Sequence, residues 1–163
     1  PLSVVVAKKI TLPENPELAL GAVTSDGYVL WSGRRPGNFA TQHSILRQAH
    51  TKAQNQWQQF APACPSVTVG DRLIVLVDDG IATGMTVEVA VRALRLQKPA
   101  AIWICVPVAP LEVLPSLREY CDRLIVLETP DIFLSVSRFY QEFTQVETSE
   151  AIECLKRQQE WVK

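Results

Sequence analysis

The chain has 163 residues, of which 47% are hydrophobic and 20% are charged, and its formal net charge is −1. This length allows one α/β domain with a sizeable core and is too short for two ordinary domains. The nearly balanced charge argues against a broad surface for nucleic acid or anionic membranes, and no apolar run reaches the length of a membrane span. The four cysteines show neither close pairing nor metal-ligand spacing, which predicts free thiols and a cytoplasmic location.

The first forty residues combine strand and turn signals. An apolar run over residues 3–7 predicts a strand that ends at two basic residues, Lys8 and Lys9. Residues 16–20 predict a short helix, because proline is tolerated in a first helical turn. Two apolar runs then flank the sequence Ser-Asp-Gly at residues 25–27, which predicts a β-hairpin.

A basic loop and a long helix follow this hairpin. Residues 32–39 carry Arg34 and Arg35 between glycines and a proline, which predicts an irregular segment. Residues 41–60 predict an amphipathic helix, because apolar side chains recur on one face and polar side chains on the other. That apolar face consists of Ile45, Ala49, Ala53, Trp57 and Phe60.

The rest of the chain alternates between strands and helices. Residues 73–77 form an uninterrupted apolar run, which is typical of a parallel strand buried on both faces. Two acids, Asp78 and Asp79, and a loop with two threonines follow, and then an amphipathic helix. Further strands at residues 101–106 and 123–127 predict a parallel sheet with right-handed crossovers. Residues 149–161 predict a terminal amphipathic helix.

The loop of residues 82–86 has the composition of a phosphate site. Backbone N–H groups at the start of a helix point outward together, and the helix dipole favours an anion there. Gly84 lets the backbone approach a ligand, and two threonine hydroxyls add donors. The preceding acids suit a sugar diol or a hydrated Mg²⁺. A diol site at the acids together with a phosphate site at the loop matches the two ends of a ribose 5-phosphate. The alternative is that the acids only solvate a sheet edge.

Residues 74–86 resemble the phosphoribosyl pyrophosphate (PRPP) motif of type I phosphoribosyltransferases. Four apolar residues precede two acids, two further residues, and Ala-Thr-Gly-x-Thr; Gly80 stands where many members carry an aliphatic residue. The resemblance implies an α/β fold of the type I phosphoribosyltransferase kind, with a mostly parallel sheet, helices on both faces and a flexible β-hairpin. Members usually carry an earlier strand ending in Arg-Gly-Gly, which this sequence does not show. We therefore expect a single domain over residues 1–163 that lacks its first N-terminal strand.

The resemblance also implies roles for individual residues. Asp78 and Asp79 would hold the ribose hydroxyls, and the loop after them would bind substrate and wrap the 5-phosphate. The members of that loop are Gly80, Ile81, Ala82, Thr83, Gly84, Met85 and Thr86. Lys8 and Lys9 match the family's pyrophosphate-binding turn by their order in the chain and by their charge. The alternative is that the two lysines only keep the end of a strand in contact with water.

Two further predictions concern the loop that covers the site and the acceptor. Arg34 and Arg35 would close over the diphosphate, or else form a plain exposed basic loop. Phe133 follows the last strand and would contact an acceptor, with a role in the core as the alternative. Ala82 stands where 6-oxopurine salvage enzymes of the family carry an Asp, which argues against hypoxanthine or guanine as acceptor.

The implied reaction is transfer of 5-phosphoribose from PRPP to a nitrogen acceptor with release of pyrophosphate. Mg²⁺ would enter with PRPP, and Asp78 and Asp79 are its candidate protein ligands. Two alternatives stay open, which are a regulator that senses PRPP or nucleotides and a non-catalytic domain of a larger protein. We expect no nucleic-acid or membrane partner, and dimers are common in the family.

Overall fold

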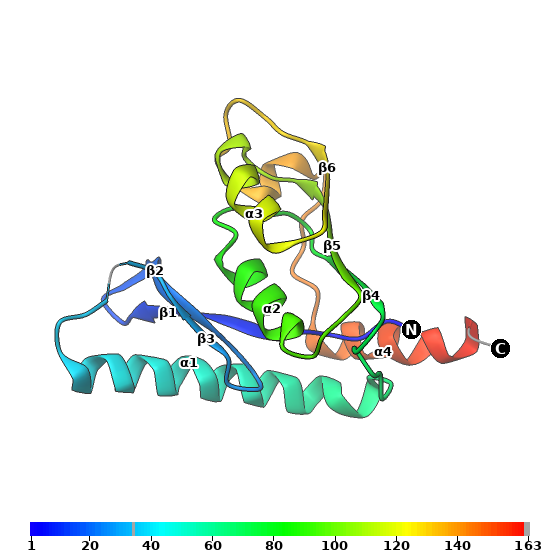
Figure 1. The fold of residues 1–163 in the computed structure, drawn as a ribbon, viewed down its shortest axis with the longest axis horizontal. Helices are drawn as coiled ribbons and strands as arrows, with labels where there is room; N and C mark the ends of the chain where they lie inside the picture. Colours follow the sequence, from blue (N-terminus) through cyan, green and yellow to red (C-terminus); the bar gives the residue numbers. More distant parts are fainter. Residues whose placement is uncertain (34, 162–163) are drawn as a thin grey trace. The chain divides into compact units, whose positions relative to one another are not determined.

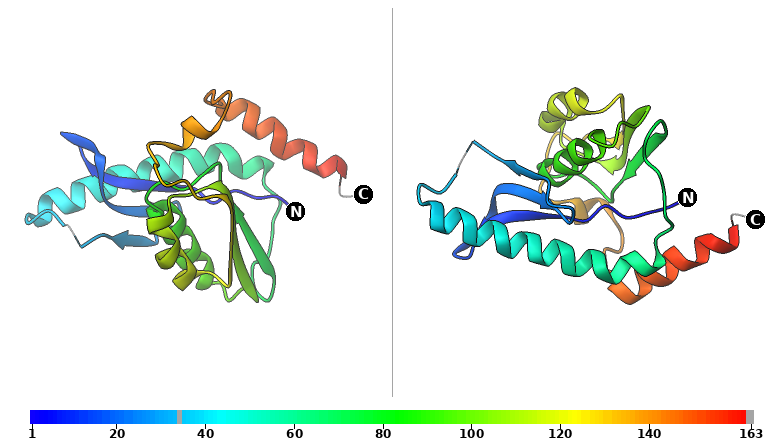
Figure 2. Two further views of the ribbon diagram at one scale, coloured as in Figure 1. Left: turned by 90° about the horizontal axis from the view of Figure 1, so that it is seen from above. Right: turned by 60° about the horizontal axis from the view of Figure 1, so that its bottom comes forward.

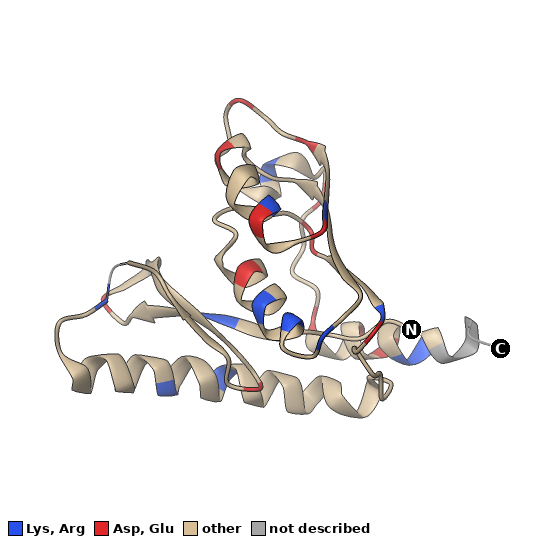
Figure 3. Cartoon of the chain, in the orientation of Figure 1, with Lys and Arg blue, Asp and Glu red and all other residues tan. Residues whose placement is uncertain are grey.

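The computed structural model describes residues 1–33 and 35–161 (Figure 1). The chain forms two compact units. Unit 1 comprises Pro1–Val67 and Gln145–Lys163, and unit 2 comprises Thr68–Thr144. Acidic and basic residues are interspersed along both units (Figure 3), as expected for a chain with a net charge near zero.

Unit 1 is a small antiparallel sheet with long helices. Its strands are paired in the order β1-β2-β3, and α1 runs along one face of the sheet (Figures 1 and 2). The elements are β1 (Ala7–Leu12), β2 (Asn15–Thr24), β3 (Val29–Trp31), α1 (Phe39–Phe60), the 3₁₀ turn η1 (Ala61–Ala63) and α4 (Thr148–Trp161).

Local sequence explains where α1 begins and which face it buries. The side chain of Asn38 accepts a hydrogen bond of 2.8 Å from the backbone N–H of Ala40, which caps the helix. Ile45 and Ala49 are buried with Ile10 and Val23 from the sheet. The predicted helix over residues 41–60 and the predicted hairpin around residues 25–27 are therefore confirmed.

Two predictions for the first twenty residues are wrong. Lys8 and Lys9 do not form a turn after a strand, because both lie inside β1, where they pair with Val23 and Ala22. Residues 16–20 are not helical but belong to β2, in which Ala19 pairs with Thr11 of β1 across an irregular part of the ladder. Pairing with a neighbouring strand here overrides the local preference of the sequence.

Unit 2 contains a parallel sheet in the order β4-β5-β6, with crossover helices between the strands. Its elements are β4 (Leu73–Val77), α2 (Met85–Arg95), β5 (Ala101–Val108), η2 (Leu111–Val113), α3 (Leu114–Tyr120), β6 (Arg123–Glu128) and η3 (Val136–Phe139). The predicted α/β class, with strands at residues 73–77, 101–106 and 123–127, is confirmed.

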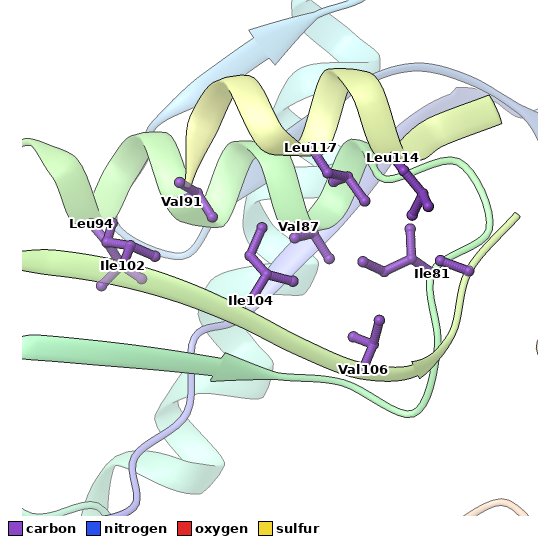
Figure 4. Packing of buried hydrophobic residues seen from close by; sticks show 10 residues of the cluster. Ile81, Val87, Val91, Leu94, Ile102, Ile104, Val106, Leu114 and Leu117 are labelled. Atoms are coloured by element: carbon purple, nitrogen blue, oxygen red, sulfur yellow. The ribbon is translucent and has the colours of Figure 1, made fainter. Parts of the chain in front are cut away.

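One hydrophobic core holds unit 2 together (Figure 4). Alternate residues of β5 are fully buried, among them Ile102 and Ile104, and they face Val87 and Val91 of α2 and Leu117 of α3. Within this unit α2 and α3 cover one face of the sheet. The opposite face carries apolar side chains that this unit's helices do not cover, namely Leu73, Val75 and Val77.

The charges of α2 suit its direction. Glu88 lies in its first turn, and Arg92 and Arg95 lie in its last turns, where the helix dipole favours each sign (Figure 3). Arg95 also donates to the carboxylate of Asp122 at 2.6 Å, which joins the end of α2 to the start of β6. Within the described ranges, no helix is long and apolar enough to span a membrane.

Candidate functional site

The acidic pair lies at the carboxyl end of β4. Asp78 and Asp79 are both exposed and directly follow Val77, the last residue of the strand. The backbone N–H of Asp79 donates to a carboxylate oxygen of Asp78 at 3.0 Å, which fixes the first acid against the backbone of the second. Ligands of open parallel sheets bind at this edge, outside the carboxyl ends of the strands.

The two acids differ in their electrostatic surroundings. Desolvation raises the pKa of Asp78 above its ordinary value of 3.8. The hydrogen bond from the backbone of Asp79 lowers that pKa by a smaller amount, and repulsion from the Asp79 carboxylate raises it further. The carboxyl group of Asp78 is therefore costly to ionise without a donor or cation beside it.

This shift predicts how stability depends on pH. Because the pKa of Asp78 is higher in the folded than in the unfolded chain, the free energy of unfolding falls as pH rises from about 3.8 through the raised value. Asp78→Asn keeps the acceptor for the Asp79 N–H and removes the charge. We expect the variant to be at least as stable as the wild type at pH 7, with the difference shrinking below pH 3.8.

Urea denaturation of both proteins at pH 3 and pH 7 checks this prediction. The wild type serves as the reference at each pH, so that changes common to all carboxylates cancel. A variant that is less stable than the wild type at pH 7, by more than at pH 3, would show that the ionised carboxylate stabilises the fold.

The loop after the acids opens the N-terminus of α2. Gly84 caps the helix with a φ of +74°, a left-handed conformation that favours glycine, and no side chain caps the first turn. The amide groups that begin α2 therefore have no intrahelical acceptor. Ala82 and Thr83 are exposed, and Met85 and Thr86 are half-buried. These backbone donors and two hydroxyls are the kind of group that binds a terminal phosphate.

Ile81 anchors this loop and does not face a ligand. Its side chain is 2% exposed and belongs to the core of unit 2, and its N–H donates to the carbonyl of Val108 at 2.9 Å. The prediction that Ile81 binds substrate is corrected accordingly, because neither its side chain nor its N–H is available. The bond to Val108 ties the loop to the end of β5.

Gly80 has a steric role that the sequence does not show. A Cβ at this position would lie 2.7 and 2.9 Å from the two methyl carbons of Val136, and 2.9 Å from a methyl carbon of Val108. An aliphatic residue, as many family members have there, would collide with both valines. Glycine at position 80, which departs from the motif, thus allows η3 to pack closely beside Asp78 and Asp79.

The segment after β6 places two further residues, Tyr140 and Val136, beside the acids. The hydroxyl of Tyr140 donates to the backbone carbonyl of Asp79 at 2.6 Å. Phe133 is half-buried and stacks on Phe139, with 5.7 Å between ring centroids, and Tyr140 meets Phe143 at 5.2 Å. Tyr140 and Val136 were missed as site residues; their only sequence signal is aromatic and apolar spacing after the last strand.

The predicted basic residues belong to the other unit. Lys8 and Lys9 lie in β1, and the guanidinium of Arg35 lies 5.5 Å from the centre of the Trp31 ring. Arg34 lies outside the described residues. The acids and the phosphate loop belong to unit 2, so the structure gathers the residues of the PRPP motif in one crossover. The roles of the basic residues stay predictions.

A parallel strand–loop–helix crossover with two acids and an open helix N-terminus defines a class of α/β proteins that bind phosphorylated ligands. The phosphoribosyl transferase domain family matches residues 45–143 of this chain. The chain belongs to that family, and the resemblance to type I phosphoribosyltransferases is confirmed.

Two curated relatives come from Mycobacterium tuberculosis. They are "Putative phosphoribosyl transferase Rv0571c" of strain H37Rv and "Putative phosphoribosyl transferase MT0597" of strain CDC 1551. Each is 32% identical over 161 residues, an alignment that covers 96% of this chain and 36% of the relative. The chain thus spans about a third of the length of these relatives.

A solved structure from Thermus thermophilus, that of the protein TT1426, has a similar fold. It superposes with a TM-score of 0.77 and 27% sequence identity, covering 95% of this chain and 75% of that chain. Together with the family match, this similarity confirms the predicted α/β fold of the type I phosphoribosyltransferase kind.

Proposed function

We propose that this chain transfers 5-phosphoribose from PRPP to a nitrogen acceptor and releases pyrophosphate. The observation that carries the proposal is the β4–α2 crossover, where two exposed acids precede a helix N-terminus that no side chain caps. One crossover thus offers acceptors for a sugar diol and donors for a phosphate, which are the two ends of a ribose 5-phosphate.

Different residues of the crossover would bind different parts of the substrate. Asp78 and Asp79 accept hydrogen bonds from the ribose hydroxyls, and the amides of residues 82–86 bind the 5-phosphate together with the hydroxyls of Thr83 and Thr86. Holding both ends of the sugar leaves its C1 carbon oriented for attack by the acceptor. The carboxylates also lie near the positive charge that develops on the ribose ring as pyrophosphate departs.

Mg²⁺ fits this donor set. It prefers oxygen ligands and is usually held by one or two carboxylates together with substrate phosphates, which Asp78, Asp79 and PRPP would supply. When bound, the cation supplies positive charge for the leaving pyrophosphate. Lys8 and Lys9 remain our proposed protein donors for the same group.

The acceptor is a nucleobase-like nitrogen compound that lacks a 6-oxopurine ring. Ala82 is exposed in the phosphate loop and has no carboxylate to receive a proton from such a base. Phe133 stands after the last strand and offers an aromatic face, half-buried against Phe139. This assignment of Phe133 to the acceptor is part of the proposal.

A second candidate function is a PRPP- or nucleotide-binding domain without transferase activity. The observation that favours it is the position of Lys8 and Lys9 within β1, where a pyrophosphate-binding turn was expected. Such a domain would keep the ribose 5-phosphate site and lack the donors that stabilise departing pyrophosphate.

Calorimetric titration of the chain with PRPP and Mg²⁺, followed by a pyrophosphate-release screen over nucleobases, tests these functions. Binding with acceptor-dependent release supports the transferase. Binding without release for any base supports the regulatory domain. If PRPP does not bind at all, both assignments fail. Titration with PRPP and EDTA is the matched control for the contribution of Mg²⁺.

A further inference from the structure

Both peptide groups of Asp79 are held by hydrogen bonds. On the N-terminal side, the Asp79 N–H donates to the Asp78 carboxylate at 3.0 Å. On the C-terminal side, the Asp79 carbonyl accepts from the Tyr140 hydroxyl at 2.6 Å, across 61 residues of sequence. Because a residue's side chain leaves the backbone between its two peptide groups, fixing both also fixes the direction of the Asp79 Cα–Cβ bond, and so the region that its carboxylate can reach.

The peptide between Asp79 and Gly80 is also fixed by packing. The two methyl groups of Val136 occupy the space where a Gly80 side chain would stand, with 2.7 and 2.9 Å to the ideal Cβ position. Val136 begins η3, and Tyr140 directly follows the last residue of η3. One short segment, residues 136–140, therefore meets this peptide both through a hydroxyl and through an apolar side chain.

We propose that residues 136–140 form a positioning element for the diol-binding acids, with Tyr140 as its positioning residue. The inference rests on the proposed binding of ribose 5-phosphate. It adds that the acids that bind the diol and the loop that binds the phosphate are held in place by different contacts. The phosphate loop is anchored separately, through the N–H of Ile81 on Val108. Loss of the Tyr140 hydroxyl therefore loosens the backbone of Asp79 and leaves the N-terminus of α2 in place.

Preorganisation is the physical reason for an effect on affinity. A carboxylate that is already aimed at the diol does not lose conformational freedom when the ligand binds. Without the Tyr140 bond, the Asp79–Gly80 peptide is held only by packing against Val136, so its orientation is less restricted and binding has to restore it. The loss of affinity is therefore expected for ligands whose hydroxyls bind the acids, and not for ligands that bind only through a phosphate group.

Titration of Tyr140→Phe with ribose 5-phosphate and with inorganic phosphate tests the proposal. We expect the affinity for ribose 5-phosphate to fall about fivefold to tenfold, because one hydrogen bond that orients the acid is lost. The affinity for inorganic phosphate stays within about twofold of the wild type, because the amides that bind it are not moved. A bond that only stabilised the fold would move neither affinity, or both equally.

Tyr28→Phe is the matched control in the other compact unit. Tyr28 belongs to unit 1, whereas the acids, the phosphate loop and residues 136–140 belong to unit 2. The control variant also loses one tyrosine hydroxyl, and both affinities should stay unchanged. The ¹⁵N chemical shift of Gly80 gives a readout without ligand: it should move in Tyr140→Phe and not in the control.

A second variant keeps the test sharp if Tyr140→Phe folds poorly. Val136→Ala removes the two methyl groups that pack against Gly80 and leaves Val108 unchanged, so it should reduce ribose 5-phosphate affinity selectively. The proposal is overturned if the wild type prefers ribose 5-phosphate over phosphate while Tyr140→Phe keeps the full preference. If the wild type shows no such preference, the proposed function itself fails, and the inference falls with it.

Discussion

Replacing Asp78 and Asp79 together by Asn should weaken the binding of ribose 5-phosphate by at least about a hundredfold, since each hydrogen bond to a charged group contributes roughly 1.5–3 kcal/mol. Both residues are exposed at the end of β4, and the amide oxygen that replaces the Asp78 carboxylate can still accept from the next backbone N–H. The fold should therefore be retained, which circular dichroism and thermal unfolding of the variant would verify.

Calorimetric titration with ribose 5-phosphate and with inorganic phosphate measures this effect. Asp71→Asn is the matched control, because Asp71 is an exposed acid before the opposite end of β4. Its φ is +57°, a conformation that Asn tolerates. A double variant with wild-type affinity for ribose 5-phosphate would show that the acids do not hold the diol.

Ile104→Ala should reduce the free energy of unfolding of unit 2 by roughly 2–5 kcal/mol. Ile104 is 0% exposed and lies in the middle of β5, where it meets the residues of α2 and α3 that fill the core (Figure 4). Truncation removes buried methyl and methylene groups and leaves a cavity that close-packed neighbours fill only in part. Chemical denaturation followed by tryptophan fluorescence measures the loss, with Trp103 in the same strand as a probe.

Leu96→Ala provides the comparison for this variant. Leu96 follows the last residue of α2 and is 69% exposed, so its truncation should change stability by less than about 0.5 kcal/mol. Equal losses from the two variants would contradict the assignment of Ile104 to a packed core. They would also remove the reason for expecting β5 and α2 to hold the site rigidly.

The parts of the fold that the sequence predicts correctly have strong periodic signals. The apolar face of α1 repeats along a helix of 22 residues, and the strands of unit 2 are dense runs of aliphatic residues. The β2–β3 hairpin has Asp26 and Gly27 at its turn, and Gly27 indeed adopts a φ of +91°. Each of these signals is contained within one short stretch of sequence.

The errors lie where a distant partner decides the structure. Residues 16–20 contain good helix formers after a proline, yet they are extended in β2, where Ala19 pairs with Thr11 of β1. Lys8 and Lys9 interrupt an apolar run, which favours the end of a strand, but the ladder with β2 extends through them. Backbone pairing across a hairpin does not depend on side-chain polarity at an exposed position, so polarity alone misplaces the strand end.

In the candidate site too, the features that depend on consecutive residues were predicted, and those that depend on distant residues were not. The acids and the phosphate loop occupy consecutive positions, so their placement on one crossover follows from the motif. Tyr140 and Val136 come from a segment far along the chain, since Tyr140 lies 61 positions after Asp79, and nothing in the motif indicates them. Ile81 lies within the motif but is buried, because the turn directs its side chain into the core.

A crystal structure of the chain with ribose 5-phosphate and Mg²⁺ tests the central claim most directly. We predict the phosphate group at the N-terminus of α2, within hydrogen-bond distance of the amides of residues 83–86. The two ribose hydroxyls should lie within hydrogen-bond distance of Asp78 and Asp79. A sugar phosphate bound elsewhere on the chain, or one with its phosphate turned away from α2, would contradict the account.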